Sequence, residues 1–141
     1  MLSAMRRRRL PYFFTVALVA ALATGASACG ESEEDKVRGV IEGVNESAKD
    51  GDVGGLCDAL ADDILEAQYE AKGDEGRKKC EEDLKSNVDA LKKDAEGKFE
   101  VKDVKVDGDS ASATVVDNDG DNRIKLRKQD GDWKISELSG T

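Results

Sequence analysis

The stretch KFEVKDVKVDGDSASATVVDNDGDNRIKLRKQDGDWKISEL, residues 98–138, decides the fold of this chain. Asp107-Gly108 and Asp130-Gly131 have the composition of two-residue type I′ hairpin turns, and residues 117–122 have that of a longer polar turn. Between the turns, apolar residues alternate with polar ones, as in strands that bury one face. The stretch therefore predicts four strands in an antiparallel meander.

The strand register requires one irregularity. A regular first strand would turn Phe99 and Val101 away from the face that holds Val104. One extra residue near Lys102-Asp103, a β-bulge, restores a single apolar face, so we expect a bulge there. The expected neighbours are Val104 with Ala111, Val101 with Ala113, Phe99 with Val115, Val115 with Ile124, Ala113 with Leu126, Leu126 with Ile135, and Lys128 with Trp133. The apolar face would consist of Phe99, Val101, Val104, Ala111, Ala113, Val115, Ile124, Leu126, Trp133, Ile135 and Leu138.

The residues before the strands predict three amphipathic helices that cover this face. The first begins at a capping box of Ser32 and Asp35 and ends at Gly51. The second follows Asp52, and the third ends at Gly97. Their apolar positions are Val37, Val40, Ile41, Val44 and Ala48, then Leu56, Leu60, Ile64 and Ala67, then Leu84, Val88, Leu91 and Ala95. The expected class is α+β, with three N-terminal helices on a curved four-stranded antiparallel sheet.

The N-terminal segment predicts where the protein works. Residues 22–29 read Leu-Ala-Thr-Gly-Ala-Ser-Ala-Cys and follow four arginines, 6–9, and an apolar run, 12–23, which is short of the roughly 20 residues of a membrane-spanning helix. The segment resembles the signal peptide and lipobox of bacterial lipoproteins. This resemblance implies that residues 1–28 are removed, that Cys29 carries a diacylglycerol anchor with palmitate-like chains, and that residues 29–35 form a lipidated tether. The alternative is an ordinary secretory signal cut after Ala28, which would leave Cys29 as a free thiol.

Charge restricts the partners. Without residues 1–28 the chain has 18 basic and 31 acidic residues, a formal charge of −13. Such a charge excludes nucleic acid as a partner and also repels anionic lipid head groups. The acyl anchor would therefore hold the protein at the extracytoplasmic face of the cell membrane.

Cys57 and Cys80 are expected to form a disulfide. Two cysteines usually pair outside the cytoplasm, and closing a loop of about two dozen residues stabilises a fold by roughly 3 kcal/mol. A redox or metal pair is the less favoured alternative, because the chain has no histidine and no C-x-x-C spacing.

Three helices and a bulged meander that ends in residues 130–135, DGDWKI, resemble the nuclear transport factor 2-like superfamily. The resemblance covers residues 33–138, within an expected domain 36–141, and is greatest to small envelope lipoproteins of unknown function with a cysteine in each of helices two and three. It implies a cone-shaped α+β fold. The cone would be trimmed, because residues 65–75 are too few for the hairpin that many members place before the third helix.

Enzymes of this superfamily line the cone with Asp, His or Tyr. The chain has no histidine, and its only candidates are Tyr69 and Glu137, the one acid expected on the inward face, near the end of the last strand. We therefore expect no catalytic site and no cofactor, but a binding module for a small apolar ligand. The expected pocket residues are Phe99, Ala113, Leu126, Lys128, Trp133 and Ile135. Lys128 opposite Trp133 is either the rim of that pocket or a lysine stem that covers the core. The alternatives are a collapsed cone that binds another envelope protein and an isomerase-like or dehydratase-like enzyme.

Asp117, Asp119 and Asp121 resemble part of a calcium loop. The EF-hand spacing fails, because its first and last ligand positions fall on Val115 and Leu126. Asp, Asn and Gly also form turns without a metal. We expect a polar turn here and no metal site.

Overall fold

The computed structural model describes residues 30–139, with Ser139 described by its backbone alone. The signal peptide and the lipidation of Cys29, both expected from the sequence, lie outside the described residues and stay predictions.

Helix α1 spans Glu33–Asp50, with the capping expected at both ends. The Ser32 hydroxyl accepts from the N–H of Asp35, and the Asp35 carboxylate accepts from the N–H of Ser32. Gly51 follows with a φ of 75°, a conformation that glycine adopts without steric cost. Residues 33–35, expected in the tether, form the first turn of this helix.

The second expected helix is divided into α2 (Val53–Asp58) and α3 (Asp62–Tyr69). Residues 59–61 run beside strand β4 (Asp132–Ser139) instead. The N–H of Ala61 donates to the carbonyl of Ile135, and the N–H of Ile135 donates to the carbonyl of Ala59, each at 2.8 Å. One continuous helix was the wrong expectation, because these backbone groups bond to the open edge of the sheet rather than to a helical turn.

The third expected helix is also two helices, α4 (Gly73–Lys85) and α5 (Val88–Ala95). The side chains of Ser86 and Asn87 both donate to the carbonyl of Asp83. Such local side-chain bonds compete with helical backbone bonds and favour a helix end. The described part of the chain thus has five helices where we expected three.

The four-stranded antiparallel meander is confirmed. Strands β1 (Glu100–Asp107), β2 (Ser110–Val116), β3 (Asp121–Gln129) and β4 lie in the order β1-β2-β3-β4. The expected bulge in β1 is confirmed too, since the register shifts between Lys102 and Lys105. Asp103, within the bulge, has a φ of 50°.

The expected register of the first two hairpins is wrong by two residues. The β1–β2 loop is Gly108-Asp109, with Gly108 at a φ of 59° as in a type II′ turn, and not Asp107-Gly108. The observed pairs are Val106 with Ala111, Val101 with Val115, Ala111 with Leu126, Ala113 with Ile124 and Val115 with Asn122. A slip of two residues keeps every side chain on its face, so the expected apolar face survives.

The last hairpin has the expected pairs Leu126 with Ile135 and Lys128 with Trp133, around the expected Asp130-Gly131 turn. The register then shifts by one residue, because Leu126 pairs with Ile135 but its neighbour Lys125 pairs with Glu137. This shift is a second bulge, in β4, which was not predicted.

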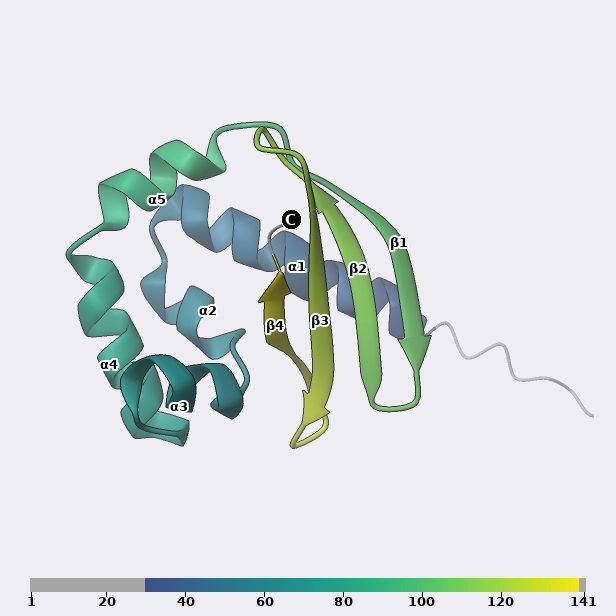
Figure 1. Ribbon diagram of the computed structural model, residues 1–141, viewed down its shortest axis with the longest axis horizontal. Helices are drawn as coiled ribbons and strands as arrows, with labels where there is room; N and C mark the ends of the chain where they lie inside the picture. Colours follow the sequence, from purple (N-terminus) through teal and green to yellow (C-terminus); the bar gives the residue numbers. More distant parts are fainter. Residues whose placement is uncertain (1–29, 140–141) are drawn as a thin grey trace, which may run out of the picture.

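In Figure 1 helix α1 runs across the curved sheet, and α2 to α5 gather beside its β4 edge. The guanidinium of Arg38 in α1 donates to the carbonyl of Val101 in β1 at 2.7 Å, which fixes the helix over the opposite edge. The main core lies between α1 and the inner face of the sheet. Its buried residues are Val37, Ile41, Val101, Ala111, Ala113, Val115, Leu126, Trp133 and Ile135.

Candidate functional site

An apolar cavity of about 210 Å³ lies between the helices and the inner face of the sheet. Helices α1, α2, α4 and α5 form one wall, and the start of β3 and the end of β4 form the other. Its lining residues are all apolar: Ile41, Val44, Leu56, Leu60, Leu84, Leu91, Phe99, Ile124, Ile135 and Leu138. Such a lining offers shape and apolar contact, and no side chain that could transfer a proton.

A neighbouring hollow of about 270 Å³ adjoins the cavity. The two share Phe99, Ile124 and Leu138, and the second reaches Asp117, Asn122 and Arg123 at the β2–β3 turn. Among the described residues, Leu138 is a large apolar residue that stays exposed, with 59% of its surface accessible to solvent. The cavity mouth is therefore at the end of the sheet that carries the β2–β3 turn.

The expected pocket residues divide into three groups. Phe99 and Ile135 line the cavity, as expected. Ala113 and Leu126 are packed into the core and are not among the residues that line the cavity. Lys128 and Trp133 lie at the other end of β3 and β4, where they contact α1 instead.

Glu33 links these two residues to α1. One of its carboxylate oxygens accepts from the indole N–H of Trp133 and from Nζ of Lys128, each at 2.8 Å, and the other accepts from Nζ of Lys36 at 2.7 Å. The hydrogen bonds from Lys128, Lys36 and Trp133 lower the pKa of Glu33 from 4.5 to about 2. Nζ of Lys128 lies 5.2 Å from the centroid of the Trp133 ring, which is cation–π range. This geometry favours the second interpretation of Lys128, in which its side chain covers the core, and not the first, in which it forms the rim of a ligand pocket.

Sequence reasoning missed Glu33, which was assigned to an acidic tether. An acidic residue in the first turn of a helix is common, because it complements the helix dipole. Its pairing with residues a hundred positions away leaves no local pattern in the sequence.

A wider groove, of about 450 Å³, lies between α1, α2 and the β3–β4 hairpin. Val40, Gly43 and Val44 of α1 form one side and Trp133 the other, with Lys36 and Asp58 among the charged residues that line it. A side chain at Gly43 would meet no atom within 4 Å, so the glycine leaves this groove open.

Neither of the two candidates for proton transfer lines the apolar cavity. Tyr69, in α3, donates to Asp83 of α4 at 3.3 Å, and burial together with the Asp83 carboxylate raises the pKa of the phenol. The second bulge in β4 turns Glu137 outward, where it accepts from Lys125 at 2.7 Å. The expectation that Glu137 points inward is therefore wrong.

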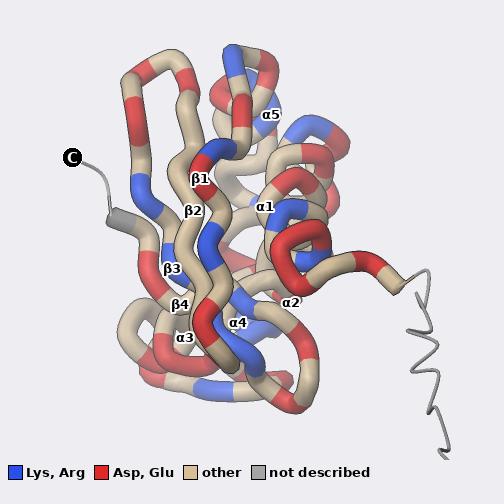
Figure 2. The backbone as a smooth tube through the Cα atoms, turned by 90° about the vertical axis from the view of Figure 1, so that its right-hand side faces the viewer, with Lys and Arg blue, Asp and Glu red and all other residues tan. Residues whose placement is uncertain are grey.

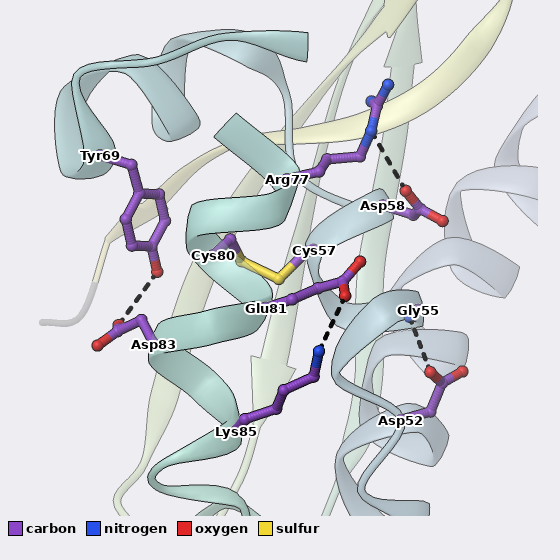
Figure 3. The surroundings of a disulfide bond; sticks show 10 residues. All are labelled: Asp52, Gly55, Cys57, Asp58, Tyr69, Arg77, Cys80, Glu81, Asp83 and Lys85. Carbon is purple, nitrogen blue, oxygen red and sulfur yellow. Dashed lines mark hydrogen bonds and ion pairs between the residues drawn. A yellow bond between two sulfur atoms is a disulfide. The ribbon is translucent and has the colours of Figure 1, made fainter. Parts of the chain in front are cut away.

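The expected Cys57–Cys80 disulfide is present and joins α2 to α4 (Figure 3). Both cysteines are fully buried and form a small second core with Leu65. Tyr69 and Leu84 pack against this cluster. The bond therefore holds α2 against α4, although α3 lies between them in the sequence.

The aspartate-rich turn is closed by its own hydrogen bonds. The Asp117 carboxylate accepts from the N–H groups of Asp119 and Gly120 and from the side-chain amide of Asn122. Asn118 accepts from the N–H of Lys98 at 3.0 Å, which joins this turn to the chain between α5 and β1. Within residues 30–139 no group of three or more His, Cys, Asp or Glu side chains could hold a metal ion.

The described residues contain no helix that is long and apolar enough to cross a membrane.

No family model and no curated protein matches this chain. Among solved structures, a proposed NTF2-like transpeptidase from Campylobacter jejuni is similar at a TM-score of 0.49 and 17% identity, over 72% of this chain and 97% of that one. A protein named Rd1NTF2 that carries five substitutions is similar at a TM-score of 0.49 and 20% identity, over 77% of this chain and 98% of that one. A de novo designed protein with a curved β-sheet is similar at a TM-score of 0.42 and 22% identity, over 74% of this chain and 99% of that one. These likenesses are weak, and the α+β class rests on the element order and strand register described above.

Proposed function

We propose that this chain is a lipid-anchored protein of the extracytoplasmic face of the cell membrane, whose nuclear transport factor 2-like domain binds a small apolar ligand without catalysis. The observation that carries the binding role is the cavity between the helices and the sheet, whose ten lining side chains are all apolar. Small-molecule sites are concave and mostly apolar, with volumes of about 300–1,000 Å³. The cavity and its neighbouring hollow together fall in that range.

The sequence supports the anchor, through the apolar run and the small residues before Cys29. A short tether would then keep the domain at the membrane surface. The net charge of the mature chain adds no attraction to anionic lipids.

A second candidate is a contact with another envelope protein. The groove beside α1 favours it, because it is larger than the cavity and is lined by Val40, Val44 and Trp133 next to charged residues. In that case the cavity would be a packing defect of a nearly collapsed cone.

Filling the cavity separates these two functions. Leu91 projects from α5 into the cavity, whereas Ala90 on the same helix is exposed. We expect Leu91→Trp to weaken binding of the neutral apolar probe N-phenyl-1-naphthylamine by about tenfold or more, because the larger side chain occupies the space that the probe needs. Ala90→Trp is the matched control and should bind the probe like the wild type.

The measurement is a fluorescence titration of the probe, with circular dichroism to show that both variants are folded. Saturable binding that is lost only in Leu91→Trp supports the cavity as the ligand site. No saturable binding by the wild type, or equal binding by the wild type and Leu91→Trp, contradicts the proposed ligand-binding role and favours the protein contact.

A further inference from the structure

We infer that the mouth of the apolar cavity faces away from the membrane, so that the ligand enters from the aqueous phase and is not a lipid taken from the bilayer. This inference rests on the proposed anchor at Cys29. It adds the position of the cavity relative to the membrane, which the proposed function leaves open.

The tether is very short. Residues 30–32 are the only ones between Cys29 and the first residue of α1, Glu33. Four Cα-to-Cα steps of an extended chain span at most about 14 Å. An anchor on Cys29 would therefore hold the first turn of α1 close to the lipid head groups.

That turn is fixed to one end of the sheet. Glu33 bonds to Lys128 and Trp133, which flank the turn between β3 and β4. In an antiparallel meander the β1–β2 turn lies at this same end, and the N–H of Lys128 indeed donates to the carbonyl of Asp109 at 2.8 Å. The end of the sheet that carries these two turns is therefore the end nearest the anchor.

The cavity mouth lies at the opposite end. The hollow outside the cavity reaches Asp117 and Asn122, at the β2–β3 turn. Helix α1 has 18 residues and a length of about 27 Å, and its far end meets α5, where Gly51 approaches Lys92 and Val88. Helix α5 supplies Leu91 to the cavity. Figure 1 shows the β2–β3 turn and α5 together, at the end of the molecule away from the two hairpin turns.

The two ends of the inner face also differ in packing. At the anchor end the face is filled, with Val37, Ala111 and Trp133 at 0%, 8% and 5% exposure. At the far end Phe99 is half-buried and Leu138 is exposed.

Acidic residues are also prominent at the anchor end, at Asp107, Asp109, Asp130 and Asp132 among others (Figure 2). This charge gives the anchor end no attraction to anionic head groups that could draw the molecule flat onto the membrane.

A pair of labels at the two ends of strand β2 tests the orientation. Asp109 and Asp119 are both exposed, lie in turns, and are separated by the seven residues of β2, which rise roughly 20 Å. Their backbone hydrogen bonds remain in Asp109→Cys and Asp119→Cys, and the two native cysteines of the domain are buried in their disulfide. Each full-length, lipidated variant is labelled with a maleimide dye and bound to phosphatidylcholine vesicles that contain some phosphatidylglycerol and nitroxide-headgroup lipid.

The expected result is loss of fluorescence at position 109 and none at position 119, because nitroxide quenching acts only over short distances. Equal quenching at both positions, or stronger quenching at 119, overturns the inference. So does the absence of quenching at both while the protein floats with the vesicles, since the tether would then not hold the hairpin end near the lipid. Lipidation is checked separately by flotation. A protein that does not float with the vesicles contradicts the anchor itself, and so the proposed function.

Discussion

At the scale of single residues, Glu33 joins the start of the first helix to the last hairpin. Its carboxylate accepts hydrogen bonds from two lysines and an indole N–H, although the side chain is partly exposed. The charged carboxylate accepts these bonds more strongly than the neutral carboxyl group does, and they therefore lower its pKa to about 2. The stability that this contact provides should therefore depend on pH.

The variant Glu33→Gln tests this dependence. A lowered pKa in the folded state stabilises the fold above the unfolded pKa, and this stability is lost as the pH falls through the folded value. The urea midpoint of the wild type should exceed that of Glu33→Gln by a constant amount above about pH 5, and the difference should vanish toward about pH 2.

Glu34→Gln, in the same first turn, is the control and should change the midpoint little, because Glu34 is exposed. A Glu33→Gln midpoint equal to that of the wild type at neutral pH would show that the contact does not stabilise the fold.

The single-residue predictions from the sequence were right where the cause is local. The capping box at Ser32 and the glycine at position 51 could be predicted, because both depend on residues within one turn of the helix. The role of Glu33 could not be predicted, since it depends on a contact across a hundred residues. The outward turn of Glu137 was not predicted, although Ile135 and Leu138 are out of phase on a regular strand and this conflict indicates the second bulge.

At the scale of secondary structure elements, the alternation of apolar residues along a strand predicted the structure better than the composition of the turns did. The bulge near Asp103 was predictable because Phe99 and Val101 would otherwise face solvent. The register was wrong by two because Asp107-Gly108 and Gly108-Asp109 are both acceptable hairpin loops. The breaks within the second and third helices could not be predicted from periodicity, since the first arises from pairing of residues 59–61 with β4.

The break at residues 59–61 makes the disulfide important, because the bond joins α2 to α4 across it. We expect the double variant Cys57→Ala, Cys80→Ala to lower the free energy of unfolding by about 3 kcal/mol, the chain-entropy value for a loop of this length, where the cysteines are 23 positions apart. Urea denaturation monitored by circular dichroism measures the change.

Wild-type protein reduced with dithiothreitol should match the double variant. Two thiols that react with Ellman's reagent in unfolded but unreduced mature domain would show that the bond does not form.

At the scale of the whole molecule, helix α1 connects the two ends of the domain that the proposal distinguishes. The first helix begins at the end nearest the proposed anchor and ends under α5, beside the apolar cavity. The sequence predicted a sheet with one apolar face and helices over it. It could not predict which of these apolar residues line a cavity, because Leu56, Leu60, Leu84 and Leu91 have the same helical spacing as residues of a closed core.

The central claim is that a lipid anchor on Cys29 holds a ligand-binding domain outside the cytoplasm. Native mass spectrometry of the full-length gene product, purified in mild detergent from the membranes of its own host, tests it most directly. We expect a chain that begins at Cys29, with the added mass of an acylated glycerol, one disulfide, and a small molecule that dissociates on activation. A chain that begins at another residue, or one with an unmodified Cys29 and no retained molecule, would contradict it.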